Sequence, residues 1–186
     1  MNAAFVNYGA GKHGFLPFDE ISPECFLKPF DPNSHHKPDY RDLLKVGQEL
    51  IVRLEKEERS TKGAALTTYI SLAGRFSVLM PNSPRGGGIS RKITSSADRR
   101  RLKEITAELE IPQGMGLIVR TAGANRPKPE IKRDCEYLMN QWDSIREITL
   151  GSVAPALIYE EASLIKRAIR DGYSRDIDEV VVDGEA

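Results

Sequence analysis

The chain has 186 residues, of which 40% are hydrophobic and 29% are charged, a composition typical of one or two ordinary globular domains. The formal charge is zero, and no apolar run approaches the roughly 20 residues of a membrane-spanning helix, which argues against an integral membrane protein. The first residues lack the basic start and apolar stretch of a signal peptide, and the two cysteines form no CxxC pair, so a reducing, cytoplasmic setting is expected.

The neutral total conceals an uneven distribution of charge. Residues 81–103 contain seven basic side chains and one acidic one, whereas residues 174–186 contain one basic and five acidic side chains. A local basic patch on a neutral protein is compatible with an anionic partner held at one place. A solvated loop and helix face is an equally good explanation of the same run.

The first part of the chain is predicted to consist of short strands. Two strands flank a glycine-containing turn within residues 3–18, and a loop rich in Pro, Asn, His and Asp follows over 23–40. Further strand-like runs cover 47–58, 62–74 and 76–81. Short strands in close succession, with glycine turns and aromatic residues, indicate a small antiparallel barrel such as an OB fold.

The second part is predicted to alternate strands and helices, so we place a domain boundary near residue 70. The expected elements are a loop over 85–93, a helix from Ser96 to just before Pro112, a strand over 116–123, a helix over 129–148, a short helix near 161–170 and a final strand over 177–184. In the long helix, apolar residues recur at steps of four and three. One buried helical face should therefore carry Ile131, Cys135, Leu138, Trp142 and Ile145.

The residues of hydrolytic enzymes are poorly represented. No GxSxG segment indicates a serine hydrolase, and Cys25 and Cys135 show no reactive context. The histidines are His13, His35 and His36, and the last two lie in the polar loop, where a solvated pair is a better interpretation than a metal site.

No GxxxxGK[ST] phosphate-binding loop is present either. Acidic pairs stand at Glu160–Glu161 and at Asp176 and Asp178. Such pairs are compatible with a divalent metal, but the ends of helices and strands also carry acids for solubility.

RNA-binding features are better represented. Phe5, Tyr8 and Phe15 cluster in the first two predicted strands, and Phe5 and Phe15 share a face if the turn sets that register. Exposed aromatic side chains on such a face stack on bases, at about 1–3 kcal/mol each. Lys62 is placed to hold a neighbouring phosphate. The same aromatic residues are equally compatible with the core of a small barrel.

The stretch GMGLIVRTAG, residues 114–123, ends a buried strand in a cation and a hydroxyl. The guanidinium of Arg120 offers a planar fork of donors that matches phosphate oxygens, and Thr121 adds a hydroxyl donor. The small residues Ala122 and Gly123 allow a ligand to approach the backbone closely. Because the sheet holds the end of a strand rigidly, the side chains of this pair are held in place, and the pair is a candidate phosphate site. The pattern alone is also that of a surface arginine at a turn.

At these residues the chain resembles a known family. The segments KEERSTKGAALTT, LMPNSPRGGGISR and GLIVRTAG, in that order, are similar to the N-terminal catalytic half of the bacterial ribonuclease E/G family, and closer to its E branch. The similarity runs along nearly the whole chain. It implies an α+β protein with an S1-type OB-fold RNA-binding domain over 1–69, a 5′-sensor over 70–165 and the start of an RNase H-like subdomain over 166–186.

The resemblance also implies an activity. The family is a magnesium-dependent, single-strand-specific endoribonuclease that initiates mRNA decay, processes rRNA and tRNA precursors and prefers a 5′-monophosphorylated end. The expected partners are single-stranded RNA and an RNA-degradation complex, not DNA. The full protein is expected to be a zinc-linked homotetramer in the cytoplasm, at the inner face of the membrane.

Site residues follow by position from the same resemblance. The expected ligands of the 5′-phosphate and the terminal nucleotide are Arg120, Thr121, Gly74 and Val78. The expected contacts of the OB-type domain with RNA are Phe5, Phe15, Lys62 and, less firmly matched, Tyr8. Arg91 and Lys92 lie in a basic loop to which we assign a supporting role.

The departures from the family pattern bear on catalysis. The family's catalytic aspartates and zinc-binding cysteines belong to a later domain, and the first strand of the OB fold is not matched. We therefore expect a non-catalytic portion that binds neither Mg²⁺ nor Zn²⁺. Two alternatives are a non-catalytic adaptor that binds single-stranded RNA without sensing its end and, with less support, a scaffold for other decay enzymes.

Overall fold

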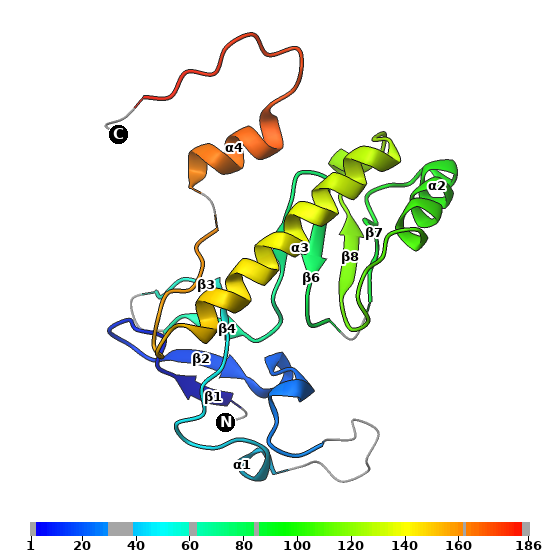
Figure 1. Cartoon of the computed structure of the whole chain (residues 1–186). Coiled ribbons are helices and arrows are strands. Elements are labelled where there is room, and N and C mark those ends of the chain that lie inside the picture. Colours follow the sequence, from blue (N-terminus) through cyan, green and yellow to red (C-terminus); the bar gives the residue numbers. More distant parts are fainter. Residues whose placement is uncertain (1–2, 30–38, 60–62, 84–85, 162, 184–186) are drawn as a thin grey trace.

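The computed structural model describes residues 3–29, 39–59, 63–83, 86–161 and 163–183. These residues form two four-stranded sheets, one above the other in Figure 1, and the long helix α3 (Lys128–Leu150) runs diagonally across the upper one. The predicted α+β class is confirmed. Within the described ranges, no helix is both long and apolar enough to cross a membrane.

The first sheet has the strand order β1-β2-β4-β3. β1 and β2 form an antiparallel hairpin, β2 and β4 run parallel, and β3 pairs antiparallel with β4 through an irregular register between Leu54 and Lys56. Its core contains Leu16, Ile21, Ala64 and Leu66. The strands are β1 (Ala3–Val6), β2 (Gly14–Pro17), β3 (Arg53–Lys56) and β4 (Ala65–Thr67), with short helical turns at η1 (Phe18–Glu20), η2 (Pro23–Cys25) and α1 (Tyr40–Leu43).

The second sheet has the strand order β5-β6-β8-β7. Its two central strands are antiparallel, and β7 joins the edge parallel to β8. The elements of this region are β5 (Leu72–Ala73), β6 (Ser77–Met80), β7 (Gly88–Ile89), α2 (Ser96–Ala107), β8 (Gly116–Val119), η3 (Thr121–Gly123), α3 and α4 (Leu164–Gly172).

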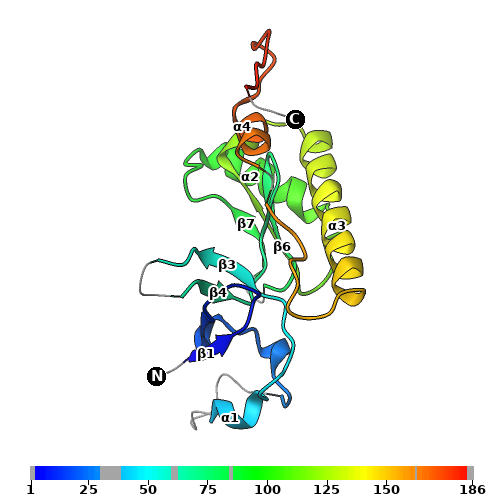
Figure 2. The ribbon, with the colours of Figure 1, turned by 90° about the vertical axis from the view of Figure 1, so that its left-hand side faces the viewer.

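The apolar face of α3 covers one side of the second sheet. Ile131, Cys135, Leu138 and Ile145 are buried and Trp142 is partly buried, so the predicted stripe is confirmed. The stripe packs against buried side chains of three strands, which are Leu72, Leu79, Leu117 and Val119. Figure 2 shows α3 on one side of this sheet.

The strand-like run at 62–74 is divided between the two sheets. β4 ends at Thr67, and Thr68 then bonds to the first region, accepting from the N–H of Ser22 at 2.7 Å and donating from its own N–H to the carbonyl of Glu20 at 2.9 Å. Asn82 bridges the connection, accepting from the N–H of Ile70 at 2.9 Å and donating to the carbonyl of Thr68 at 2.7 Å. Where the chain passes from the first sheet to the second, hydrogen bonds of the Thr68 and Asn82 side chains thus take over from the backbone pairing of strands.

Several other boundaries differ from the expectation. The run 47–58 is strand only at Arg53–Lys56, the expected loop at 85–93 contains the short strand β7, and the helix from Ser96 ends at Ala107. The strand expected over 177–184 is wrong for the described part of that range, up to residue 183, which has no strand. Val180, Val181 and Val182 are exposed there. Valines favour strands only where a neighbouring strand pairs with them.

Candidate nucleic-acid interface

The end of β8 fixes the backbone of the Arg120–Thr121 pair. The N–H of Arg120 donates to the carbonyl of Phe76 at 2.8 Å, which extends the ladder one residue beyond β8. The chain then turns into η3, where a side chain at Gly123 would meet the Phe76 carbonyl oxygen at 2.8 Å and Val119 at 2.9 Å. Glycine is therefore required for this tight turn, and the turn leaves Thr121 exposed.

Arg120 lies on the face of the sheet that α3 does not cover. Leu117 and Val119 point to the α3 side, so alternation along the strand places Ile118 and Arg120 on the other side. Val78 pairs directly with Ile118 and is half-buried on that same side. The predicted residues Val78, Arg120 and Thr121 therefore lie close together, with an apolar surface beside a cation and a hydroxyl.

The guanidinium of Arg120 is held by one of its nitrogens. Nη1 donates to the carbonyl oxygens of Gly74 at 2.5 Å and Arg75 at 3.3 Å, and to Oδ1 of Asp171 at 2.9 Å. Nε and Nη2 donate no hydrogen bond to any residue in the described ranges. The side chain is 27% exposed. Arg120 is thus oriented and still accessible, with two nitrogens available to a ligand.

Asp134, on α3, holds the turn that presents those carbonyls. Its carboxylate accepts from the backbone N–H groups of Arg75, Phe76 and Ser77 at 2.9, 3.0 and 2.8 Å, and from the Ser77 hydroxyl at 2.6 Å. A side chain at Gly74 would meet the same carboxylate at 2.6 Å. Gly74 is buried, and its carbonyl faces Arg120. Its place in the structure supports the orientation of Arg120, and its contact with a nucleotide stays a prediction.

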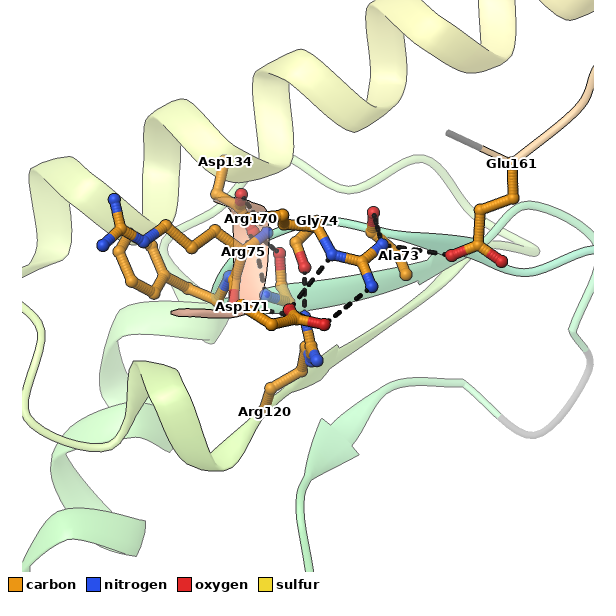
Figure 3. Close-up of polar contacts among 10 residues, drawn as sticks. Ala73, Gly74, Arg75, Arg120, Asp134, Glu161, Arg170 and Asp171 are labelled. Carbon is orange, nitrogen blue, oxygen red and sulfur yellow. Dashed lines mark hydrogen bonds and ion pairs between the residues drawn. The ribbon is translucent and has the colours of Figure 1, made fainter. Parts of the chain in front are cut away.

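A second arginine and a carboxylate from α4 complete the cluster (Figure 3). Arg170 donates to both oxygens of Asp171, from Nε at 3.1 Å and from Nη2 at 2.9 Å, while its Nη1 donates to the Ala73 carbonyl at 3.3 Å and to Glu161 at 3.1 Å. The hydrogen bond from Arg170, and then that from Arg120, lowers the pKa of Asp171 to about 2. The carboxylate is therefore ionised at any ordinary working pH.

The aromatic pair of the first sheet is exposed. Phe5 and Phe15 stand directly opposite each other in β1 and β2, with exposed fractions of 63% and 37%, and their rings lie edge to face at 6.2 Å. The interpretation of these two as barrel core is therefore wrong. Tyr8 is half-buried against the core of this sheet, and Lys62 lies outside the described residues.

The basic loop lies next to the Arg120 end of β8. Ile89 pairs with Val119 in the parallel ladder, and the N–H of Ser90 donates to the Val119 carbonyl at 2.9 Å. Arg91 and Lys92 follow at once and are exposed. Further along, a shallow hollow of about 310 Å³ is lined by Ser96, Arg99, Arg100 and Lys103. The loop therefore continues the polar surface around Thr121 with positive charge.

Among the described residues, the side chains that commonly bind metal ions are not gathered into a cluster. These residues contain no group of three or more His, Cys, Asp or Glu side chains placed to share a metal ion. Of the acidic pairs, Glu161 binds Arg170 instead. Cys25 and Cys135 lie in separate apolar clusters, and burial raises the pKa of each thiol, which disfavours a nucleophilic thiolate.

Comparison with known proteins shows the family of the chain. Residues 71–186 match the Ribonuclease E/G family, and residues 2–68 match the S1 RNA binding domain. The chain belongs to the ribonuclease E/G family. The predicted resemblance is thereby confirmed, together with an S1 region that contains the exposed aromatic pair.

The chain is more similar in sequence to two relatives of the E branch than to one of the G branch. Ribonuclease E of Escherichia coli is 50% identical over 98% of this chain and 17% of its own length, and ribonuclease E of Haemophilus influenzae is 50% identical over 98% and 19%. Ribonuclease G of Escherichia coli is 35% identical over 98% of this chain and 37% of its own length. The chain is closer to these E-branch relatives, and it spans less than a fifth of their length.

Sequence reasoning missed the residues that orient Arg120. Asp134 carried a usable signal, because it lies among the buried positions of α3, between Ile131 and Leu138, where a carboxylate needs hydrogen-bond donors. Asp171 carried none, because it is 51 positions from Arg120 and stands in an ordinary charged helix end.

Proposed function

We propose that this chain binds single-stranded RNA and recognises a 5′-monophosphate at Arg120 and Thr121, as the binding and sensing part of a ribonuclease E-type endoribonuclease. Membership of the ribonuclease E/G family and the S1 match support the RNA partner. The aromatic pair Phe5–Phe15 is suited to stack on bases without sequence preference.

The observation that carries the proposal is the state of the Arg120 guanidinium. Its Nη1 is fixed by two carbonyls and a carboxylate, while Nε and Nη2 find no partner among the described residues. These two nitrogens form one edge of the fork that binds two oxygens of a phosphate. The exposed Thr121 hydroxyl can donate to a third oxygen, and Val78 offers an apolar surface for the first base.

Arg120→Gln tests the proposal. Charge-assisted hydrogen bonds contribute about 1.5–3 kcal/mol, so the unmodified chain should bind a 5′-monophosphorylated oligonucleotide about 10- to 100-fold more tightly than its 5′-hydroxyl counterpart. The substitution should abolish that ratio and leave 5′-hydroxyl binding within about twofold. Fluorescence anisotropy with labelled oligonucleotides measures both affinities.

The matched control is Arg146→Gln. Arg146 is an exposed arginine on α3 that pairs with Asp143 at 3.6 Å, so its loss changes the net charge equally without touching the site. Equal losses of the ratio in both variants would show a general charge effect and contradict the proposal. Equal affinities of the unmodified chain for the two oligonucleotides would favour an adaptor that binds RNA without sensing its end.

The enzymatic part of the proposal concerns the full protein. The expected reaction is hydrolysis of a phosphodiester in single-stranded RNA by a magnesium-activated water, within mRNA decay and rRNA and tRNA processing in the cytoplasm. No step of that reaction is assigned to the described residues. Their part is to bind the strand and its end, so the chain alone is expected to leave RNA uncut.

A further inference from the structure

We propose that Asp171 and Arg170, at the end of α4, are positioning residues of the phosphate site. They hold Nη1 of Arg120 so that Nε and Nη2 remain directed at the incoming phosphate (Figure 3). This inference rests on the proposed function, and it assigns part of that function to a helix outside the sheet that carries Arg120.

Arg170 and Arg120 differ in how many of their guanidinium nitrogens already donate hydrogen bonds. Each nitrogen of the Arg170 guanidinium is already bound, since Nε and Nη2 donate to Asp171 and Nη1 donates to the Ala73 carbonyl and to Glu161. Arg120 uses Nη1 alone. A phosphate can therefore bind Arg120 through two nitrogens without breaking a contact of its guanidinium, whereas a two-point contact with Arg170 would displace a carboxylate or a carbonyl.

Asp171 is fixed independently of Arg120. Both of its oxygens accept from Arg170, so the carboxylate holds its place and offers Oδ1 to Arg120 as a preset acceptor. A carboxylate that competed with phosphate would instead occupy the Nε and Nη2 edge. Because Asp171 meets Nη1 at 2.9 Å, together with the Gly74 carbonyl, it fixes the rotation of the guanidinium and leaves that edge open.

Polar contacts attach α4 to the second sheet. The helix has no buried residue, and its contacts with the second sheet include Arg170 to the Ala73 carbonyl, Asp171 to Arg120, and the side chain of Arg75 to the Tyr173 carbonyl. Each of these contacts falls on the end of β5, on the turn after it or on the end of β8. The orientation of Arg120 therefore depends on α4 being docked, and no apolar core would be lost with a change at Asp171.

The test compares Asp171→Ala with Asp171→Asn in the 186-residue chain. Alanine removes both acceptor oxygens and the charge, while asparagine keeps one oxygen for Nη1 and replaces the other oxygen and the charge by a neutral NH2 group. If Asp171 positions Arg120, alanine should lower the ratio of 5′-monophosphate to 5′-hydroxyl affinity by about 3- to 10-fold, and asparagine should restore at least half of that loss on a logarithmic scale. Affinity for 5′-hydroxyl RNA should stay within about twofold in both variants.

Asp143→Ala is the matched control, because it removes an exposed carboxylate that is paired with an arginine on α3. It should leave the ratio unchanged, and the melting temperatures of all three variants should agree within a few degrees. A ratio that rises or stays constant in Asp171→Ala overturns the inference, since a competing anion would raise it in both Asp171 variants. If the unmodified chain binds 5′-monophosphate and 5′-hydroxyl RNA with equal affinity, the proposed function fails and the inference fails with it.

Discussion

The two sheets of this chain offer contrasting surfaces to a nucleic acid. The first presents two exposed aromatic rings on paired strands, with their backbone in register and no preset charge between them. The second presents Arg120, whose orientation is fixed by contacts from the turn after β5 and from α4. Rings that accept any base suit the interior of a strand, whereas a fixed cation beside a hydroxyl suits a chemically distinct end.

The contrast also concerns how each surface is built. The aromatic pair depends on one hairpin and one register, in which Phe5 stands opposite Phe15. The cation depends on residues 45 to 51 positions away from it in the sequence, and on Asp134, which holds the intervening turn. Stacking surfaces are therefore simple to encode locally, while a directed guanidinium needs long-range contacts.

The largest effect is expected from removing the stacking surface. Phe5→Ala combined with Phe15→Ala should weaken binding of 5′-monophosphate and 5′-hydroxyl RNA alike, because each stacked base contributes about 1–3 kcal/mol, or roughly 5- to 150-fold. The ratio of the two affinities should not change. Tyr137→Ala, at an exposed aromatic residue on α3, serves as the control in the same anisotropy assay. A loss confined to the 5′-monophosphate strand would break the proposed division between the two sheets.

A smaller effect is expected at the hydroxyl. Thr121→Val keeps the shape of the side chain and removes one donor, which contributes about 0.5–1.5 kcal/mol, so the 5′-monophosphate affinity should fall about 3- to 10-fold with no change for 5′-hydroxyl RNA. Thr149→Val, which removes a hydroxyl bonded within α3, is the control. Unchanged binding in Thr121→Val would remove Thr121 from the site and leave Arg120 as the only ligand.

The smallest effect is expected from pH. A phosphate monoester loses its second charge near pH 6, so the preference for a 5′-monophosphate should decline about two- to fivefold between pH 7.5 and 5, with its midpoint near 6. Asp171 does not contribute in that window. The pKa of Asp171 in the folded chain, about 2, lies below the ordinary 3.8. The stability that its ionised carboxylate gives to the fold is therefore complete above about pH 4 and is lost only as the pH falls toward 2. A preference that does not change between pH 7.5 and 5 would contradict the assignment of the effect to the phosphate.

Local patterns in the sequence were sufficient for much of the fold. The spacing of Ile131, Cys135 and Leu138 predicted the buried face of α3, and the predicted helix start near Ser96 is where α2 begins. Arg120 was found because it ends a buried strand at a small-residue turn. The strand expected at 177–184 was wrong because a run of valines carries strand propensity but does not supply a pairing partner.

The supporting contacts of the candidate site depend on tertiary structure. Asp171 and Arg170 reach Arg120 only because α4 docks against the second sheet, and neither the charge pattern nor the helix period of that segment encodes the docking. The connection at Thr68 likewise follows from side-chain bonds to Glu20 and Asn82, which lie far from it in the sequence. Sequence alone therefore predicted Arg120 and Thr121 as candidate ligands of a phosphate but not the contacts that orient Arg120.

The most direct measurement is the ratio of the dissociation constants of the unmodified chain for one single-stranded RNA carrying a 5′-hydroxyl or a 5′-monophosphate, at pH 7.5 and fixed salt. A fixed guanidinium edge and an adjacent hydroxyl predict a ratio of about 10 to 100 in favour of the monophosphate. A ratio of one would contradict the claim that the second sheet reads the end of the strand.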